Sequence, residues 1–232
     1  VMISFNKQGV EGVQRQGEYY SLLLMAVAGG YVFLAAAELI TFFVGLEIMS
    51  VALYSLCASA LDRRASLEAG IKYFLLGSFA SAILLYGMAL LYGATGGTEY
   101  AKIISIAAGS PGPLLYAGAV LLLCGVAFKV GLVPLHFWVP DVYQGAPTAV
   151  SACMAAAVKS VALMAALRIL WVMFAPLENF WSNYIWWAAC LSILFGNLAA
   201  LVQRSLKRML AYSSIAHAGY MAMGLLGGVR NE

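Results

Sequence analysis

Residues 114–147 read LLYAGAVLLLCGVAFKVGLVPLHFWVPDVYQGAP. This stretch opens as an apolar run that holds one charge, Lys129, ahead of Pro134. About 20 apolar residues form a helix that crosses about 30 Å of hydrocarbon. Pro134 has no N–H to donate to the Val130 carbonyl, so the helix must break or kink there. Such a break at membrane depth indicates an ion or substrate path. A proline-ended surface loop is the equally weighted alternative.

The chain as a whole has the same apolar character. Of its 232 residues, 63% are hydrophobic and 10% are charged, and the mean hydropathy is +0.89. A soluble domain usually carries about 25% charged residues. The composition therefore excludes a soluble enzyme and a disordered tail. The net charge of +3 is also too small and too scattered for a nucleic-acid-binding face.

Further apolar stretches of helical length lie on both sides of the opening one. They predict an all-α polytopic membrane protein with about seven transmembrane helices, including one proline-broken helix. The seven expected spans are 19–36, 38–60, 69–93, 113–133, 147–172, 183–202 and 209–228.

Basic residues in the connections predict the orientation of the chain. Lys and Arg concentrate on the cytoplasmic side of membrane proteins. Their distribution over alternate connections places the segments 1–18, 61–68 and 203–208 on that side. The connection 173–182 is then on the outer side, where a belt of tryptophans supports the assignment. These are Trp171, Trp181, Trp186 and Trp187.

Three charged residues, Glu47, Lys129 and Lys159, fall in the middle of expected spans. Each costs about 2.5–3.5 kcal/mol on insertion scales. A buried ion pair that fixes helix packing is one interpretation, although apolar residues would do this at lower cost and one lysine would remain over. We favour a proton relay of one acid and two lysines next to the broken helix.

Two further residues are secondary relay candidates. Lys72 lies in the first turn of its helix with Glu68 four residues before it, so a surface ion pair is the simpler interpretation. His217 belongs to a polar stripe on an apolar helix, where a packing role and a relay role are equally weighted. His136 lies at the helix break beside Pro134 and has no assigned role.

The chain shows no pattern for a cofactor or a metal. The four cysteines are far apart inside apolar stretches and form no C-x-x-C motif. No glycine-rich loop follows a strand, so we expect neither a nucleotide site nor a redox centre in this chain. The cysteines are Cys57, Cys124, Cys153 and Cys190.

Four strings carry a resemblance to a known family. The string from Phe128 to Pro147 resembles the broken-helix signature of antiporter-like subunits of respiratory complex I (NADH-quinone oxidoreductase), and of the subunit N branch in particular. The supporting strings are GLEIMS at 45–50, EAGIKYF at 68–74 and KRMLAYSSIAH at 207–217. The likeness extends from about Glu18 to Gly227.

The resemblance implies a division into repeats. Segment 1–18 would be a cytoplasmic N-terminal segment, and 19–172 a complete five-helix antiporter-like repeat. After the outer loop 173–182, residues 183–232 would be the first two helices of a second, inverted repeat. By that alignment the sequence lacks the second broken helix with its lysine, and we expect it to be about half of the subunit.

The resemblance also implies a function. The chain would belong to a proton-translocating membrane-arm subunit of complex I in the bacterial inner membrane. Glu47, Lys129 and Lys159 match the proton line of the family, and Lys72 matches a further family lysine. NADH, FMN, iron–sulfur clusters and quinone would be bound by other subunits. The implied partners are the lipid bilayer, antiporter-like subunit M and small subunits such as K, J and A, with no nucleic acid.

Two alternatives stay open. One is an Mrp-type cation/proton antiporter or a membrane-bound hydrogenase subunit, against which the string from Asp141 to Pro147 speaks. The other is a non-conducting membrane scaffold in which the buried charges only fix the packing.

Overall fold

The computed structural model describes residues 16–227. Predictions for residues 1–15 and 228–232 lie outside this range. Within it, regular structure is helical apart from one isolated bridge between Glu38 and Glu99. The α-helices are α2 (Gln16–Ala35), α3 (Leu39–Cys57), α4 (Arg64–Thr95), α5 (Tyr100–Gly109), α6 (Pro113–Val130), α7 (Trp138–Gly145), α8 (Thr148–Cys153), α9 (Lys159–Arg168), α10 (Glu178–Leu201) and α11 (Leu206–Leu225). The π-helical turns Met154–Val158 and Ile169–Met173 flank α9, and the 3-10 turn Ala175–Leu177 precedes α10.

Among the described residues, six helices are long and apolar enough to cross a membrane. The chain is thus an all-helical integral membrane protein, as predicted. The seventh expected span forms α11, a helix of 20 residues that is less apolar than the others. Its first turn carries Lys207 and Arg208, and hydroxyl side chains follow them. The six apolar stretches are 17–35, 39–57, 64–95, 113–130, 148–173 and 175–201.

Glycines let neighbouring helices approach closely. A Cβ atom on Gly45 of α3 would lie 2.3 Å from the backbone nitrogen of Phe33 in α2. A Cβ atom on Gly87 of α4 would lie 2.7 Å from the nitrogen of Leu122 in α6. Small residues at such crossings are typical of membrane helices, whose association depends on close van der Waals packing.

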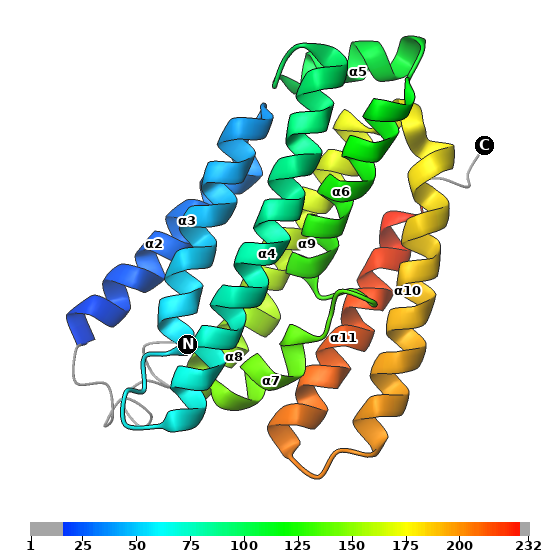
Figure 1. Cartoon of the computed structure of the whole chain (residues 1–232). Helices are drawn as coiled ribbons and strands as arrows, with labels where there is room; N and C mark the ends of the chain where they lie inside the picture. The colour runs from blue at the N-terminus through cyan, green and yellow to red at the C-terminus, as the bar shows by residue number, and fades with distance from the viewer. Residues whose placement is uncertain (1–15, 228–232) are drawn as a thin grey trace.

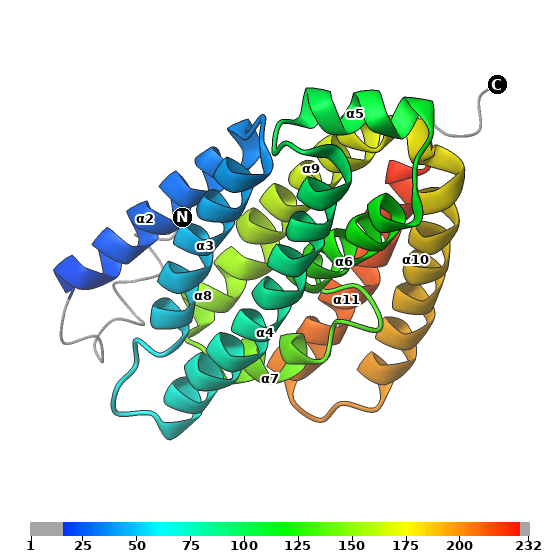
Figure 2. The ribbon, with the colours of Figure 1, turned by 45° about the horizontal axis from the view of Figure 1, so that its top comes forward.

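The two ends of the bundle differ (Figures 1 and 2). At one end α5 lies across the bundle, after a turn in which Gly96 ends α4 in the left-handed conformation with φ 69°. At the other end lie α7, the 58–63 connection and the 202–205 connection. The short helix α5 was not predicted, because its ten residues fall inside a connection rich in glycine and serine.

The broken helix consists of α6, a non-helical segment 131–137 and α7. The break begins at Gly131, three residues before Pro134, because Gly131 takes the left-handed conformation with φ 82°. Its N–H donates to the Ala127 carbonyl at 2.9 Å and to the Phe128 carbonyl at 3.1 Å, and the indole of Trp138 also donates to the Phe128 carbonyl at 2.9 Å. The predicted break is thus present. Its geometry depends on the hydrogen bonds of Gly131 and Trp138 as well as on the proline.

Candidate functional site

Lys129 is buried in the last turn of α6, with 5% of its surface exposed. Its ammonium group donates to Ser50 Oγ on α3 at 2.7 Å and to Tyr73 Oη on α4 at 3.2 Å. Within residues 16–227, no carboxylate lies at ion-pair distance from this nitrogen. Two neutral oxygens from two other helices therefore hold the charge.

Aromatic rings surround the same ammonium group. Lys129 Nζ lies 5.3 Å from the ring centre of Tyr73 and 5.8 Å from that of Tyr54, distances that allow cation–π attraction. The two rings contact edge to face at 4.7 Å. Gly77 makes room for Tyr54, since a Cβ atom there would lie 2.1 Å from the Tyr54 hydroxyl.

Glu47 lies one turn before Ser50 on α3 and is half-buried. Its carboxylate accepts a hydrogen bond from Ser81 Oγ of α4 at 2.5 Å. A cavity of about 10 Å³, lined in part by Ser50, Ser81 and Lys129, lies between these groups. Such a volume is at the lower limit for one water molecule. Lys129 lines this cavity directly, whereas Glu47 is linked to it through the Ser81 hydroxyl, and the two charged groups form no ion pair.

Lys159 occupies a second buried site, with 3% of its surface exposed. It is the first residue of α9, directly after the π-helical turn. Its ammonium group donates to Ser214 of α11 twice, to the hydroxyl at 2.6 Å and to the carbonyl at 2.7 Å. The predicted central lysines are therefore both buried and both bound by neutral oxygens.

A row of aromatic side chains runs from the Lys129 site into α7. Tyr73 stacks on Trp138 with ring centres 4.5 Å apart and planes at 11°. Trp138 in turn contacts Tyr143 edge to face at 6.0 Å. Through this row the position of α7 is coupled to the tyrosine that accepts from Lys129.

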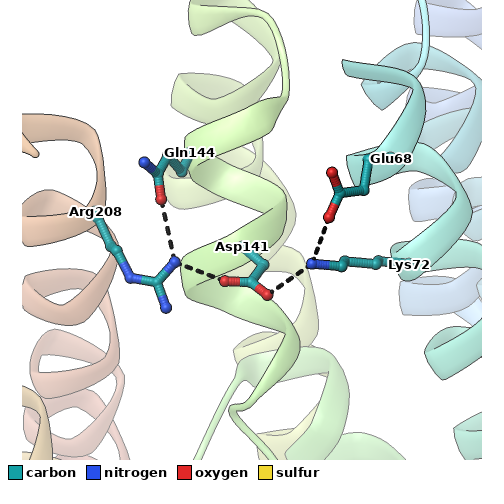
Figure 3. A network of polar contacts seen from close by, with 5 residues as sticks. All are labelled: Glu68, Lys72, Asp141, Gln144 and Arg208. Carbon is teal, nitrogen blue, oxygen red and sulfur yellow. Dashed lines mark hydrogen bonds and ion pairs between the residues drawn. The ribbon is translucent and has the colours of Figure 1, made fainter. Parts of the chain in front are cut away.

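Lys72 belongs to a separate, partly exposed cluster between α4, α7 and α11 (Figure 3). Its ammonium group pairs with Glu68 at 2.7 Å, which confirms the predicted ion pair, and with Asp141 at 3.0 Å. The second Asp141 oxygen pairs with Arg208 at 2.6 Å, and Arg208 also donates to Gln144 at 3.1 Å. The cluster lines an open cavity of about 320 Å³.

Asp141 lies outside the six apolar helices. Burial acts to raise the pKa of its carboxyl group, but the bonds and charges of Lys72 and Arg208 outweigh this effect. The net result is a pKa below the ordinary value, so the carboxylate stays ionised at neutral pH.

Both histidines lie away from the two buried lysine sites. His217 is exposed on α11, and its ring contacts Tyr220. His136 is half-buried in the broken segment, where its ring packs on Phe195 of α10 at 4.7 Å. Pro134 is exposed, and the adjacent Val133 N–H donates to Ser192 of α10 at 2.9 Å.

Several members of the site do not follow from the sequence. The four-residue spacing of Gly77 and Ser81 in the sequence indicates close helix packing and not a polar role for Ser81. The sequence places Ser214 in the polar stripe around His217 and does not connect it with Lys159. It indicates no role for Tyr73 or for a pair of Asp141 with Arg208. A polar side chain on an apolar helix is the available signal for Ser81 and Ser214, whereas nothing local indicates which distant charge Asp141 meets.

The six apolar helices, the broken helix and the two buried lysines define an antiporter-like membrane protein. Residues 36–231 match the transmembrane family described as NADH:quinone oxidoreductase/Mrp antiporter, and the chain belongs to this family.

Known relatives share both sequence and structure with the chain. It is 47% identical over 215 residues to NADH-quinone oxidoreductase subunit N of Trichlorobacter lovleyi, covering 91% of this chain and 44% of that protein. A chain of Thermus thermophilus respiratory complex I aligns with a TM-score of 0.77 at 46% identity over 91% of this chain and 45% of its own length. A chain of an archaeal membrane-bound sulfane sulfur reductase aligns with a TM-score of 0.84 at 31% identity over 97% of this chain and 46% of its own. The chain thus spans less than half of the length of each relative.

Proposed function

We propose that this chain is part of a membrane-arm subunit of an NADH-quinone oxidoreductase and that it moves protons across the bacterial inner membrane. The names of the relatives support the complex. Electron transfer from NADH through FMN and iron–sulfur clusters to quinone would take place in other subunits. The neighbours in the membrane would be subunit M and small subunits such as K, J and A.

The single observation that carries this proposal is the uncompensated burial of Lys129. Its ammonium group is almost fully buried and bonds only to neutral oxygens within the described residues. An unpaired buried charge costs free energy that an apolar residue would save, so a packing role alone does not account for it. A group that gains and loses a proton during turnover does account for it.

In the proposed cycle, Lys129 carries a proton, and the charge of Glu47 sets the proton affinity of Lys129. A charged Glu47, bonded to the Ser81 hydroxyl that lines the small cavity, stabilises the ammonium form of Lys129, and loss of that negative charge favours release of the proton. Ser50, Tyr73 and Ser81 offer hydroxyl groups that can accept and donate around this space. Lys159 would receive the charge next, with Ser214 as its partner.

The test replaces Lys129 by alanine in the full-length subunit within the assembled complex. In sealed membrane vesicles we expect intact assembly and a reduced number of protons pumped per NADH oxidised. The matched control is Lys102→Ala, since Lys102 is exposed on α5 and its ammonium group donates to the Gly96 carbonyl, away from the buried lysine sites. Full pumping by an assembled Lys129→Ala complex would instead support the non-conducting scaffold.

The proposed orientation puts the 61–68 and 203–208 segments on the cytoplasmic side. Both lie at the α7 end of the bundle, and the 173–182 segment lies at the α5 end. The excess of basic side chains at the α7 end supports this direction.

A further inference from the structure

The helix α7 is short and follows non-helical backbone, so its own hydrogen bonds do little to fix it. It has eight residues. An isolated helix of that length is unstable in water, and its position must come from tertiary contacts. The segment 131–137 before it has no regular structure. Something other than chain continuity with α6 must therefore set where α7 lies.

Asp141 supplies two such contacts, one on each side of α7 (Figure 3). One carboxylate oxygen pairs with Lys72 of α4 at 3.0 Å, and the other pairs with Arg208 of α11 at 2.6 Å. Each oxygen thus has its own cation, and the two cations come from helices on opposite flanks. A carboxylate held in this way resists movement of α7 towards either neighbour.

The first residue of α7 transmits this position to the buried lysine. Trp138 bonds to the Phe128 carbonyl, next to Lys129 in the chain, and stacks on Tyr73. Tyr73 accepts a hydrogen bond from Lys129. A shift of α7 therefore moves the indole that bonds to the last turn of α6 and stacks on Tyr73.

We infer that Asp141 is a positioning residue for the Lys129 site: by pairing with Lys72 and Arg208 it fixes α7, and through Trp138 and Tyr73 it fixes the surroundings of the ammonium group. The inference rests on the proposed function, because its consequence is measured as proton transfer through Lys129. It gives the exposed cluster a role in proton transfer without making Asp141 itself a carrier.

The test uses the full-length subunit in the assembled complex in sealed vesicles. Asp141→Asn keeps the size of the side chain and removes its charge. We expect the protons pumped per NADH oxidised to fall roughly two- to fivefold, the population shift that partly exposed ion pairs can supply. Asp141→Glu, which keeps the charge, is expected to restore pumping. Asp62→Asn is the matched control, because Asp62 is exposed in the 58–63 connection at the same end of the bundle.

The outcomes separate this inference from the proposed function. If Lys129→Ala abolishes pumping while Asp141→Asn pumps like the unmodified complex, the positioning role is wrong and the proposed function stands. If the Lys129→Ala complex pumps fully, the proposed function is wrong, and the positioning role that rests on it is wrong as well. An assembled Asp141→Glu complex that pumps no better than Asp141→Asn also overturns the positioning role. Should Asp141→Asn not assemble, Arg208→Gln removes one of the two pairs, and unchanged pumping there overturns the inference.

Discussion

At the scale of single residues, the Lys129 site depends on hydroxyl groups that hold a charge without neutralising it. Ser50→Ala removes the acceptor at 2.7 Å and leaves the buried ammonium with Tyr73 alone. Loss of a hydrogen bond to a buried charge costs about 1–3 kcal/mol. We therefore expect lower thermal stability and reduced pumping of the assembled complex.

Ser55→Ala is the matched control for this change. Ser55 lies on the same helix but is exposed, and its hydroxyl bonds only to the Val51 carbonyl. Melting temperature and proton pumping of Ser55→Ala are expected to equal those of the unmodified complex. If both serine variants behave alike, Ser50 has no special role at Lys129.

The ion pairs of Asp141 predict that the thermal stability of the complex depends on pH. Its folded-state pKa is below the ordinary carboxyl value, so its ion pairs stabilise the fold above that value and are lost as pH falls through the folded pKa. The melting temperature of the unmodified complex should exceed that of Asp141→Asn at neutral pH. The difference should shrink below about pH 4. A difference that is equal at both pH values would contradict the ion-pair account.

Residue chemistry was readable from the sequence only where a residue departed from its surroundings. Glu47, Lys129 and Lys159 stand alone in apolar stretches, and the structure buries both lysines and half-buries Glu47. The Lys72–Glu68 pair followed from helical spacing and is confirmed. Pairing across helices has no such local signal. Asp141 and Arg208 are 67 residues apart, and only the folded chain brings them together.

Among the helices, α7 packs closely against α4 at Gly145, with no room for a larger side chain. A Cβ atom on Gly145 would lie 2.4 Å from the Ala65 carbonyl oxygen. Gly145→Ala must therefore push α7 away from α4, at a cost of about 1–3 kcal/mol for overpacking. We expect a lower melting temperature and reduced pumping. Gly109→Ala is the control, since nothing lies within 4 Å of a Cβ atom there.

The elements were predicted where apolar length was decisive. Six expected spans correspond to six long apolar helices. The end of the fourth span was less predictable. The helix ends at Gly131, three residues before Pro134, and the indole of Trp138, which lies in α7, bonds to its last turn. The helix α5 was missed because a short helix inside a polar connection has no periodicity long enough to recognise.

At the scale of the whole molecule, the bundle has two distinct ends whose sides of the membrane can be measured. Asp62→Cys puts a thiol at the α7 end, and Ser110→Cys puts one next to α5 at the other end. An impermeant thiol reagent should label the Asp62→Cys variant only from the cytoplasm and the Ser110→Cys variant only from the outside. Labelling of both variants from one side would contradict the arrangement of the spans, and the reverse pattern would contradict the orientation.

The proposal of proton transfer rests on Glu47 and Lys129 acting together, with Ser81 bonded to Glu47 and lining the small cavity between α3, α4 and α6 that Lys129 also lines. Its most direct test is the number of protons pumped per NADH oxidised by the assembled complex carrying Glu47→Gln. Glu99→Gln is the control, since Glu99 is exposed at the other end of the bundle. We predict that Glu47→Gln assembles and oxidises NADH but pumps fewer protons per NADH than Glu99→Gln. An unchanged ratio in Glu47→Gln would contradict the claim.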